Sequence, residues 1–262
     1  MALKAKAEVS EVSILEISQG EVRFAVVGTS PFYFNRMSEK AKRTLLLGGR
    51  KKTEADKAAN LKHHPVEEYR DSVYRWTENT RPTRLKIPSP SFKGVMSTAA
   101  LVLPGTRKTE IGRLVWVVDQ YVDFYGIPQL SMDIVRSADM ARTPDVRTRA
   151  KVREWACLVT VRFVQPNLTV KGISNLMAAG GIVAGVGDYR QEKGKGNFGQ
   201  FRLADLDDEE FRRIKAEGGR EAQDDALENY VAYDPDTAEL LDWFSAEIVR
   251  LGRDKSNKKE AA

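Results

Sequence analysis

Runs of β-branched and aromatic residues alternate with helical patterns along the chain, and their order predicts an α+β fold. SEVSILEIS and EVRFAVVG predict an opening hairpin with its turn at Gln19 and Gly20. Further strands are expected in TRLKIP, RLVWVVDQ, QLSMDIVRS and GQFRL, and in one long run from Val146 to Gln165. The segment from Val152 to Leu203 reads as strand, helix, glycine-rich loop and strand. It could form one split βαβ unit of a ferredoxin-like fold.

Capping residues predict where the helices begin. Ser38 precedes a short helix, Pro65 opens a second, and Ser89 or Ser91 precedes FKGVMSTAALVL. Asn167 or Thr169 precedes VKGISNLMAAGG, and the pattern is helical from Asp207 onward.

Composition shifts divide the chain into a main domain and two appended segments. Residues 1–204 form the α+β domain, and a basic stretch without periodicity at about 48–64 is expected to be a mobile insertion. Residues 205–252 form an acidic helical extension, and 253–262 read as a disordered tail.

Bulk composition favours a folded protein of the cytoplasm. Hydrophobic residues make up 42% and charged residues 30% of the 262 positions. We find no signal-peptide pattern and no apolar run long enough to span a membrane. The single cysteine, Cys157, excludes an internal disulfide and is expected to be an inert, buried side chain.

The charge is distributed unevenly. The net charge is +5, but residues 203–240 carry four basic and thirteen acidic side chains, a local net charge of −9. The rest of the chain therefore carries +14, since +5 + 9 = +14. A basic body with an acidic segment suggests a polyanionic partner and permits head-to-tail contacts between copies.

A ladder of alternating cations supplies the first candidate binding site. Arg147, Arg149, Lys151 and Arg153 occupy every second position of the predicted long strand, so they share one face. Their spacing of roughly 6.6 Å is comparable with the phosphate repeat of an extended single strand. The alternative is an exposed edge strand that its charges protect against aggregation.

A glycine-rich stretch supplies the second site, because seven of the nineteen glycines lie within positions 180–199. GKGNFG matches a dinucleotide turn or a kinase glycine-rich loop only formally. A strand follows it instead of a helix, and the HRD and DFG motifs are missing. A Walker A spacing is also absent. Either the loop is a plain surface hairpin or it receives phosphates and bases.

For the second interpretation we predict three groups of contacts. The side chains are Tyr189, Arg190, Lys193, Lys195 and Phe198, and the glycines that permit close backbone approach are Gly185, Gly187, Gly194, Gly196 and Gly199. A third basic cluster consists of Arg50, Lys51 and Lys52.

No catalytic constellation is apparent, so a non-enzymatic protein without a cofactor or metal is expected. His63 and His64 with Glu67 and Glu68 could be read as a metal site. Adjacent histidines seldom converge on one ion without a fixed third ligand, so we do not predict one.

HPVEEYRDSVYRW, IPSPSFKGVMSTAALV and the run from VREWACLV to GQFRL resemble a family of uncharacterised bacteriophage proteins. The glycine-rich ending is similar to that of the RAMP superfamily, the backbone subunits of CRISPR effector complexes. This resemblance implies an RRM-like βαββαβ core, a glycine-rich loop near RNA, and filament-like oligomers. The region lacks a histidine that could serve RNA cleavage.

The leading hypothesis is therefore a phage-type, non-catalytic protein that binds single-stranded DNA or RNA and oligomerises along it. It would act in annealing and recombination or as a guide-RNA scaffold. The alternatives are a phage structural or assembly protein and a RAMP-type RNA-processing nuclease.

Overall fold

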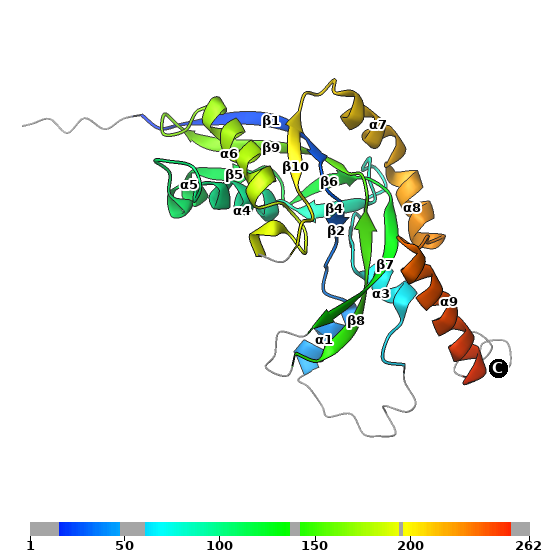
Figure 1. The fold of residues 1–262 in the computed structure, drawn as a ribbon. Helices are drawn as coiled ribbons and strands as arrows, with labels where there is room; N and C mark the ends of the chain where they lie inside the picture. Colours follow the sequence, from blue (N-terminus) through cyan, green and yellow to red (C-terminus); the bar gives the residue numbers. More distant parts are fainter. Residues whose placement is uncertain (1–15, 48–60, 137–141, 194–195, 253–262) are drawn as a thin grey trace, which may run out of the picture.

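The computed structural model describes residues 16–47, 61–136, 142–193 and 196–252, which form an α+β fold as the sequence predicts (Figure 1). The predicted disordered tail, 253–262, and most of the predicted mobile insertion, 48–64, lie outside the described residues.

The main sheet is antiparallel and runs in the order β10-β1-β9-β6-β4-β3. β1 (Ser18–Gly28) pairs on one side with β10 (Phe201–Ala204) and on the other with β9 (Ala156–Gln165). The sheet continues through β6 (Tyr121–Tyr125), β4 (Leu85–Pro88) and β3 (Tyr74–Arg75), and β5 (Val115–Val117) also pairs with β9. Because β9 and β10 flank β1 and are connected through α6 (Val170–Val183), they form the predicted split βαβ arrangement.

Alternation along β1 builds two packed faces. Phe24 and Val26 point into the main core, where α4 (Pro90–Ala99) and α6 cover the sheet. Ala25 and Val27 point to the opposite face and pack with Phe211 of α7 (Glu209–Glu217). A strand buried on both faces carries apolar residues at successive positions, as this one does.

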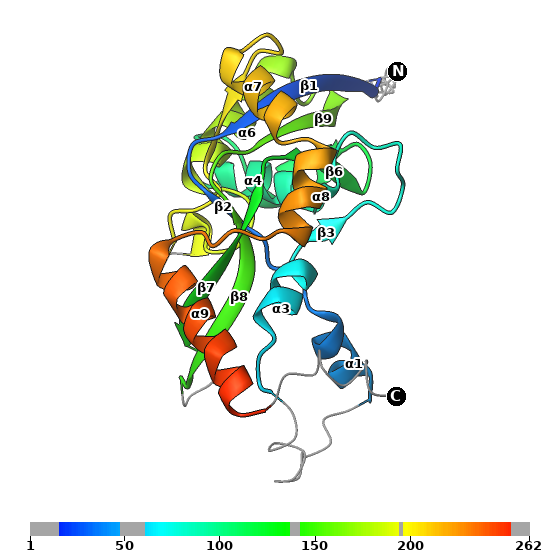
Figure 2. The same cartoon turned by 90° about the vertical axis from the view of Figure 1, so that its right-hand side faces the viewer.

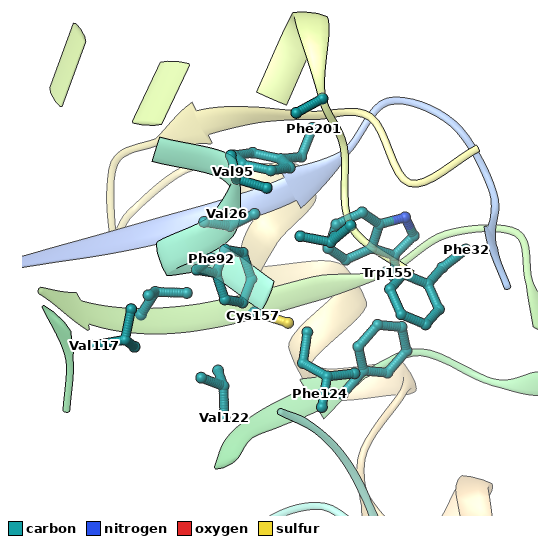
Figure 3. Close-up of a cluster of buried hydrophobic side chains, with 14 of the residues drawn as sticks. Val26, Phe32, Phe92, Val95, Val117, Val122, Phe124, Trp155, Cys157 and Phe201 are labelled. Carbon is teal, nitrogen blue, oxygen red and sulfur yellow. The ribbon is translucent and has the colours of Figure 1, made fainter. Parts of the chain in front are cut away.

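Trp155 occupies the centre of the main core (Figure 3). Its ring stacks on Phe124 with centroids 5.7 Å apart and meets Phe32 edge-on at 5.4 Å. Its indole N–H donates to the carbonyl of Ser30 at 2.8 Å, so the buried polar atom is satisfied. Cys157 is fully buried beside this cluster, and burial raises the pKa of its thiol, consistent with the expected inert role.

A second sheet in the order β2-β8-β7 projects from the first (Figure 2). β7 (Pro128–Arg136) and β8 (Pro144–Val152) form a long antiparallel hairpin, and β2 (Phe32–Tyr33) pairs with the end of β8. α1 (Glu39–Leu47) and α3 (Pro65–Asp71) belong to the same lobe, and α9 (Pro235–Arg250) runs along β7. The remaining elements are α5 (Lys108–Leu114), α8 (Arg220–Glu228) and a 3₁₀ turn at Gln191–Lys193.

The acidic helices are part of the core rather than loosely attached. Gln223 of α8 is fully buried, and its side-chain oxygen accepts from the backbone N–H groups of Arg84 and Leu85 at 2.7 and 2.8 Å. Its amide donates to the carbonyls of Phe124 and Gly218 at 2.7 and 2.8 Å. A satisfied buried amide of this kind fixes α8 against the sheet.

Several predicted helix starts are confirmed. Ser38 accepts a hydrogen bond from the N–H of Ala41 at 3.3 Å, and Thr169 accepts one from Gly172 at 3.1 Å. Asp208 and Asp234, which the sequence analysis did not single out, cap α7 and α9 in the same way. Ser89 occupies the position before α4, but its hydroxyl donates to the carbonyl of Asp119 instead of capping the helix.

Two strand predictions are wrong. Gln19 and Gly20 make no turn and lie within β1, because they pair continuously with β9. The run from Val146 to Gln165 is two strands in different sheets, since the chain bends between β8 and β9 to bury Trp155. No helix within the described ranges is long and apolar enough to cross a membrane.

Two glycine-to-alanine substitutions should change stability in opposite directions. At Gly94, within α4, a methyl group would meet nothing within 4 Å, so alanine should raise the free energy of unfolding by about 0.5–1 kcal/mol. At Gly181 a methyl group would overlap the carbonyl oxygen of Phe201, so alanine should lower the free energy of unfolding by about 1–3 kcal/mol. Urea unfolding followed by tryptophan fluorescence measures both, and shifts of the same sign would contradict this packing.

Candidate nucleic-acid interface

The glycine-rich loop between α6 and β10 folds back on its own backbone. The N–H of Val186 donates to the carbonyl of Gly199 at 2.9 Å, and that of Phe198 donates to Tyr189 at 3.3 Å. The N–H of Asp188 donates to the carbonyl of Tyr33 at 3.1 Å, which ties the loop to β2. These bonds join the described residues 185–189 and 198–199 to each other and to β2.

The glycines are needed for this internal closure. Gly185, Gly187 and Gly199 have φ angles of +70°, +87° and +72°, which L side chains rarely adopt. A methyl group on Gly196 would overlap the carbonyl of Tyr189. We predicted close approach to these backbones, and the approaching groups in the structure are the protein's own carbonyls. Gly194 lies outside the described residues.

Arg149 is buried where β8, β2 and the loop meet. Its side chain is only 5% exposed, with one Nη 2.5 Å from a carboxylate oxygen of Asp188 and the other 3.6 Å from Asp133. The guanidinium also lies over the rings of Tyr33 and Tyr189, at 5.1 and 4.9 Å from their centroids. Arg149 thus joins the second sheet to the glycine-rich loop.

Lys151 is enclosed by three aromatic rings. Its ammonium nitrogen lies 4.8 Å from the centroids of Tyr33 and Phe198 and 3.8 Å from that of Tyr233. Burial lowers the pKa of Lys151 from its ordinary value. Burial also raises the pKa of Tyr33, whose hydroxyl donates to Asp133 at 3.0 Å. The Lys151 ammonium therefore interacts with aromatic rings inside the protein.

The expected solvent-facing ladder of cations is therefore wrong in part. Arg147, Arg149 and Lys151 do share one face of β8, but Arg149 and Lys151 are buried because aromatic rings and carboxylates cover them. Arg153 lies beyond the end of β8, donates to Gln129 at 3.0 Å and lies 3.9 Å from the Tyr233 centroid. Arg147 is exposed and makes no ion pair among the described residues.

Other predicted contacts fall into two groups. Arg190 is half-buried, and it donates to Glu192 at 2.8 Å and to the carbonyl of Gly187 at 2.9 Å. The ring centroids of Tyr189 and Phe198 lie 5.7 and 4.8 Å from that of Tyr33, so both rings pack against β2. The backbone of Tyr189 has a φ of +50°. Arg50, Lys51, Lys52, Lys195 and the side chain of Lys193 lie outside the described residues.

A set of residues that the sequence analysis missed lies on β3, β4 and β6 and at Trp76, directly after β3. The ammonium of Lys86 is 4.2 Å from the centroid of Trp76 and 4.0 Å from that of Tyr121, and the ring of Tyr74 is 6.1 Å from Tyr121. We call Tyr74, Trp76, Lys86 and Tyr121 the aromatic track. Desolvation lowers the pKa of Lys86, which makes no ion pair within the described part of the chain. The alternation of aromatic residues with a cation in VYRW was the available signal.

Tyr74 connects the aromatic track to the glycine-rich loop. It lines a cavity of about 220 Å³, which we call the loop pocket, together with Ser91 at the start of α4 and with Gly187, Asp188 and Arg190 of the loop. Tyr74 therefore belongs both to the aromatic track and to the wall of the loop pocket.

A larger cavity of about 450 Å³ lies between α1, α3 and β8 and carries mixed charge. The two ring nitrogens of His63 each lie 3.1 Å from a carboxylate, that of Glu68 and that of Asp145. Within the ranges that the structure describes, no group of three or more histidine, cysteine or acidic residues could hold a metal ion.

No protein-family model and no curated protein matches the chain. The geometry of the interface is therefore the basis for a function.

Removing Asp188 should destabilise the protein much more than removing a surface carboxylate. In Asp188→Ala the buried Arg149 keeps only the longer contact to Asp133, and we expect a loss of about 3 kcal/mol in the free energy of unfolding. Arg149→Met combined with Asp188→Ala should recover part of that loss. Glu154→Ala breaks the exposed pair with Arg213 and should cost less than about 1 kcal/mol. Denaturant unfolding compares them, and equal losses would contradict the role of Arg149.

Proposed function

We propose that this protein binds single-stranded nucleic acid without cleaving it. The observation that carries the proposal is the aromatic track, where the Lys86 ammonium lies on two rings and makes no ion pair among the described residues. Stacking platforms next to unneutralised cations are the combination that sequence-tolerant single-strand binding requires. Tyr74 and Tyr121 are half-buried, so each can offer part of a ring to a base.

The strand would run from the aromatic track past Tyr74 to Arg190 at the loop. Lys86, Arg190 and the exposed Arg147 would neutralise phosphates. Arg149 and Lys151 would not touch the strand, since internal partners occupy them. In this proposal they position Tyr33, Tyr189 and Phe198, and Gly187, Asp188 and Arg190 of the glycine-rich loop form one wall of the site.

The order of elements supports the RAMP-like part of the hypothesis. In chain order β1, α4, β6, β9, α6 and β10 follow a βαββαβ sequence, and their sheet order β10-β1-β9-β6 suits a ferredoxin-like core. The β7–β8 hairpin would be an insertion between the two halves. On this basis we propose a phage-type protein of the host cytoplasm that acts in annealing and recombination or as a guide-RNA scaffold.

Binding of fluorescently labelled single-stranded DNA and RNA should weaken as salt rises. The slope of log K against log salt concentration should be about −0.7 for each phosphate contact. Lys86→Ala should reduce this slope by about 0.7. Tyr121→Ala should weaken binding by about 1–3 kcal/mol and leave the slope unchanged, because it removes only stacking. Fluorescence anisotropy at several salt concentrations measures both effects.

Lys215→Ala on the acidic helix α7 is the matched control and should bind like the unsubstituted protein. The absence of binding to both DNA and RNA at low salt would refute the proposal.

The alternative, a structural or assembly protein, is favoured by exposed apolar residues on the acidic helices. Trp243 and Val249 of α9 are 60% and 67% exposed. On the other side of the molecule, α4 to α6 carry cations that make no ion pair among the described residues, namely Lys93, Arg107, Lys108, Arg113 and Lys171 (Figure 1). Opposite charges on two faces suit head-to-tail contacts between copies, which build rings or filaments.

We therefore expect homo-oligomers that lengthen on long oligonucleotides, as measured by light scattering. Trp243→Ala should shift the distribution towards the monomer, whereas Ile134→Ala, which changes an exposed residue of β7, should not. A protein that stays monomeric with and without nucleic acid would rule out assembly.

A further inference from the structure

The loop pocket has the size and walls of a site for one flat ring. Its volume of about 220 Å³ is below the roughly 300–1,000 Å³ typical of pockets for whole small molecules. Phe34, Ile87 and Pro88 form an apolar lining, Tyr74 adds an aromatic wall, and Asn35 adds an amide. The pocket lies next to the aromatic track, where we propose that the strand binds.

Asp188 and Arg190 give this pocket an acceptor and a donor side by side. One carboxylate oxygen of Asp188 binds Arg149, and the other has no hydrogen-bond partner among the described residues. Arg190 uses its Nε and one Nη internally, and its second Nη has no such partner. The positive φ angles of Gly187 and Tyr189 and the bond from the Asp188 N–H to Tyr33 fix both residues in place.

We propose that the loop pocket takes a single guanine base of the bound strand. Guanine presents adjacent N1–H and N2–H donors for the free oxygen of Asp188, and its O6, next to N1, can accept from the free Nη of Arg190. Adenine has no carbonyl oxygen for the guanidinium. Uracil and thymine offer one N3–H beside a carbonyl, but they lack the second N–H donor that guanine presents to the carboxylate. Cytosine has a ring-nitrogen acceptor between its amino group and its carbonyl, so uracil, whose N3–H is adjacent to a carbonyl, is the closest competitor.

This inference rests on the proposed function and adds a base preference to it. Single-stranded nucleic acid is read in this way when an unstacked base exposes its edges to side chains. The aromatic track would then supply affinity for any sequence, and the loop pocket would fix the register of the strand.

The test compares four RNA twelve-mers of uridine in which one central position is G, A, C or U. By fluorescence anisotropy, the strand with G should bind at least about tenfold more tightly than the strand with U. Arg190→Lys keeps the charge but loses the planar guanidinium whose internal bonds hold the free Nη in place, so it should bind the all-uridine strand nearly normally and lose the preference for G. This split separates base recognition from a phosphate contact.

Ser91→Trp should fill the pocket and abolish the preference, while Asn175→Trp, on the exposed surface of α6, should keep it. Equal affinity for all four strands, or a preference for the strand with C, would overturn the guanine assignment and leave the proposed function standing. Failure to bind any of the four strands at low salt, together with the corresponding DNA strands, would overturn both.

Discussion

The ion pair between Arg149 and Asp188 connects the parts of this protein that the candidate site depends on. Arg149 comes from the β7–β8 hairpin sheet, and Asp188 comes from the loop that leads into the main sheet. A guanidinium that is 5% exposed cannot lose its partner without a large desolvation penalty, so the loop must stay docked on the hairpin. Tyr33 and Tyr189 flank the pair and are held in place by the same constraint.

This arrangement separates two uses of positive charge. Arg149 and Lys151 are buried, and their charges are compensated by carboxylates and aromatic faces inside the protein. Lys86 and Arg147 lie at the surface without a paired carboxylate in the described chain. Only the second kind is available to a polyanion. A count of basic residues in the sequence does not distinguish the two, because burial decides it.

The glycine-rich loop illustrates the same difference. Its composition indicated correctly that some group comes close to the backbone, because glycine is the residue that tolerates such contacts. The identity of that group depended on how residues 185–199 fold, and it is the chain's own carbonyls at Val186 and Tyr189. The aromatic track was missed because its members come from three short strands, and only the sheet order places Tyr74, Lys86 and Tyr121 together.

The sequence by itself determined the local features whose causes are local. These are the α+β class, the capped starts of α1 and α6, the strand–helix–strand order from β9 through α6 to β10, and the unequal distribution of charge. Tertiary structure alone decided the break at Trp155, because burying that indole takes the chain from one sheet into the other. It also decided which cations reach solvent and which side chains line the loop pocket. Those outcomes depend on contacts between residues far apart in the chain, which periodicity and spacing do not encode.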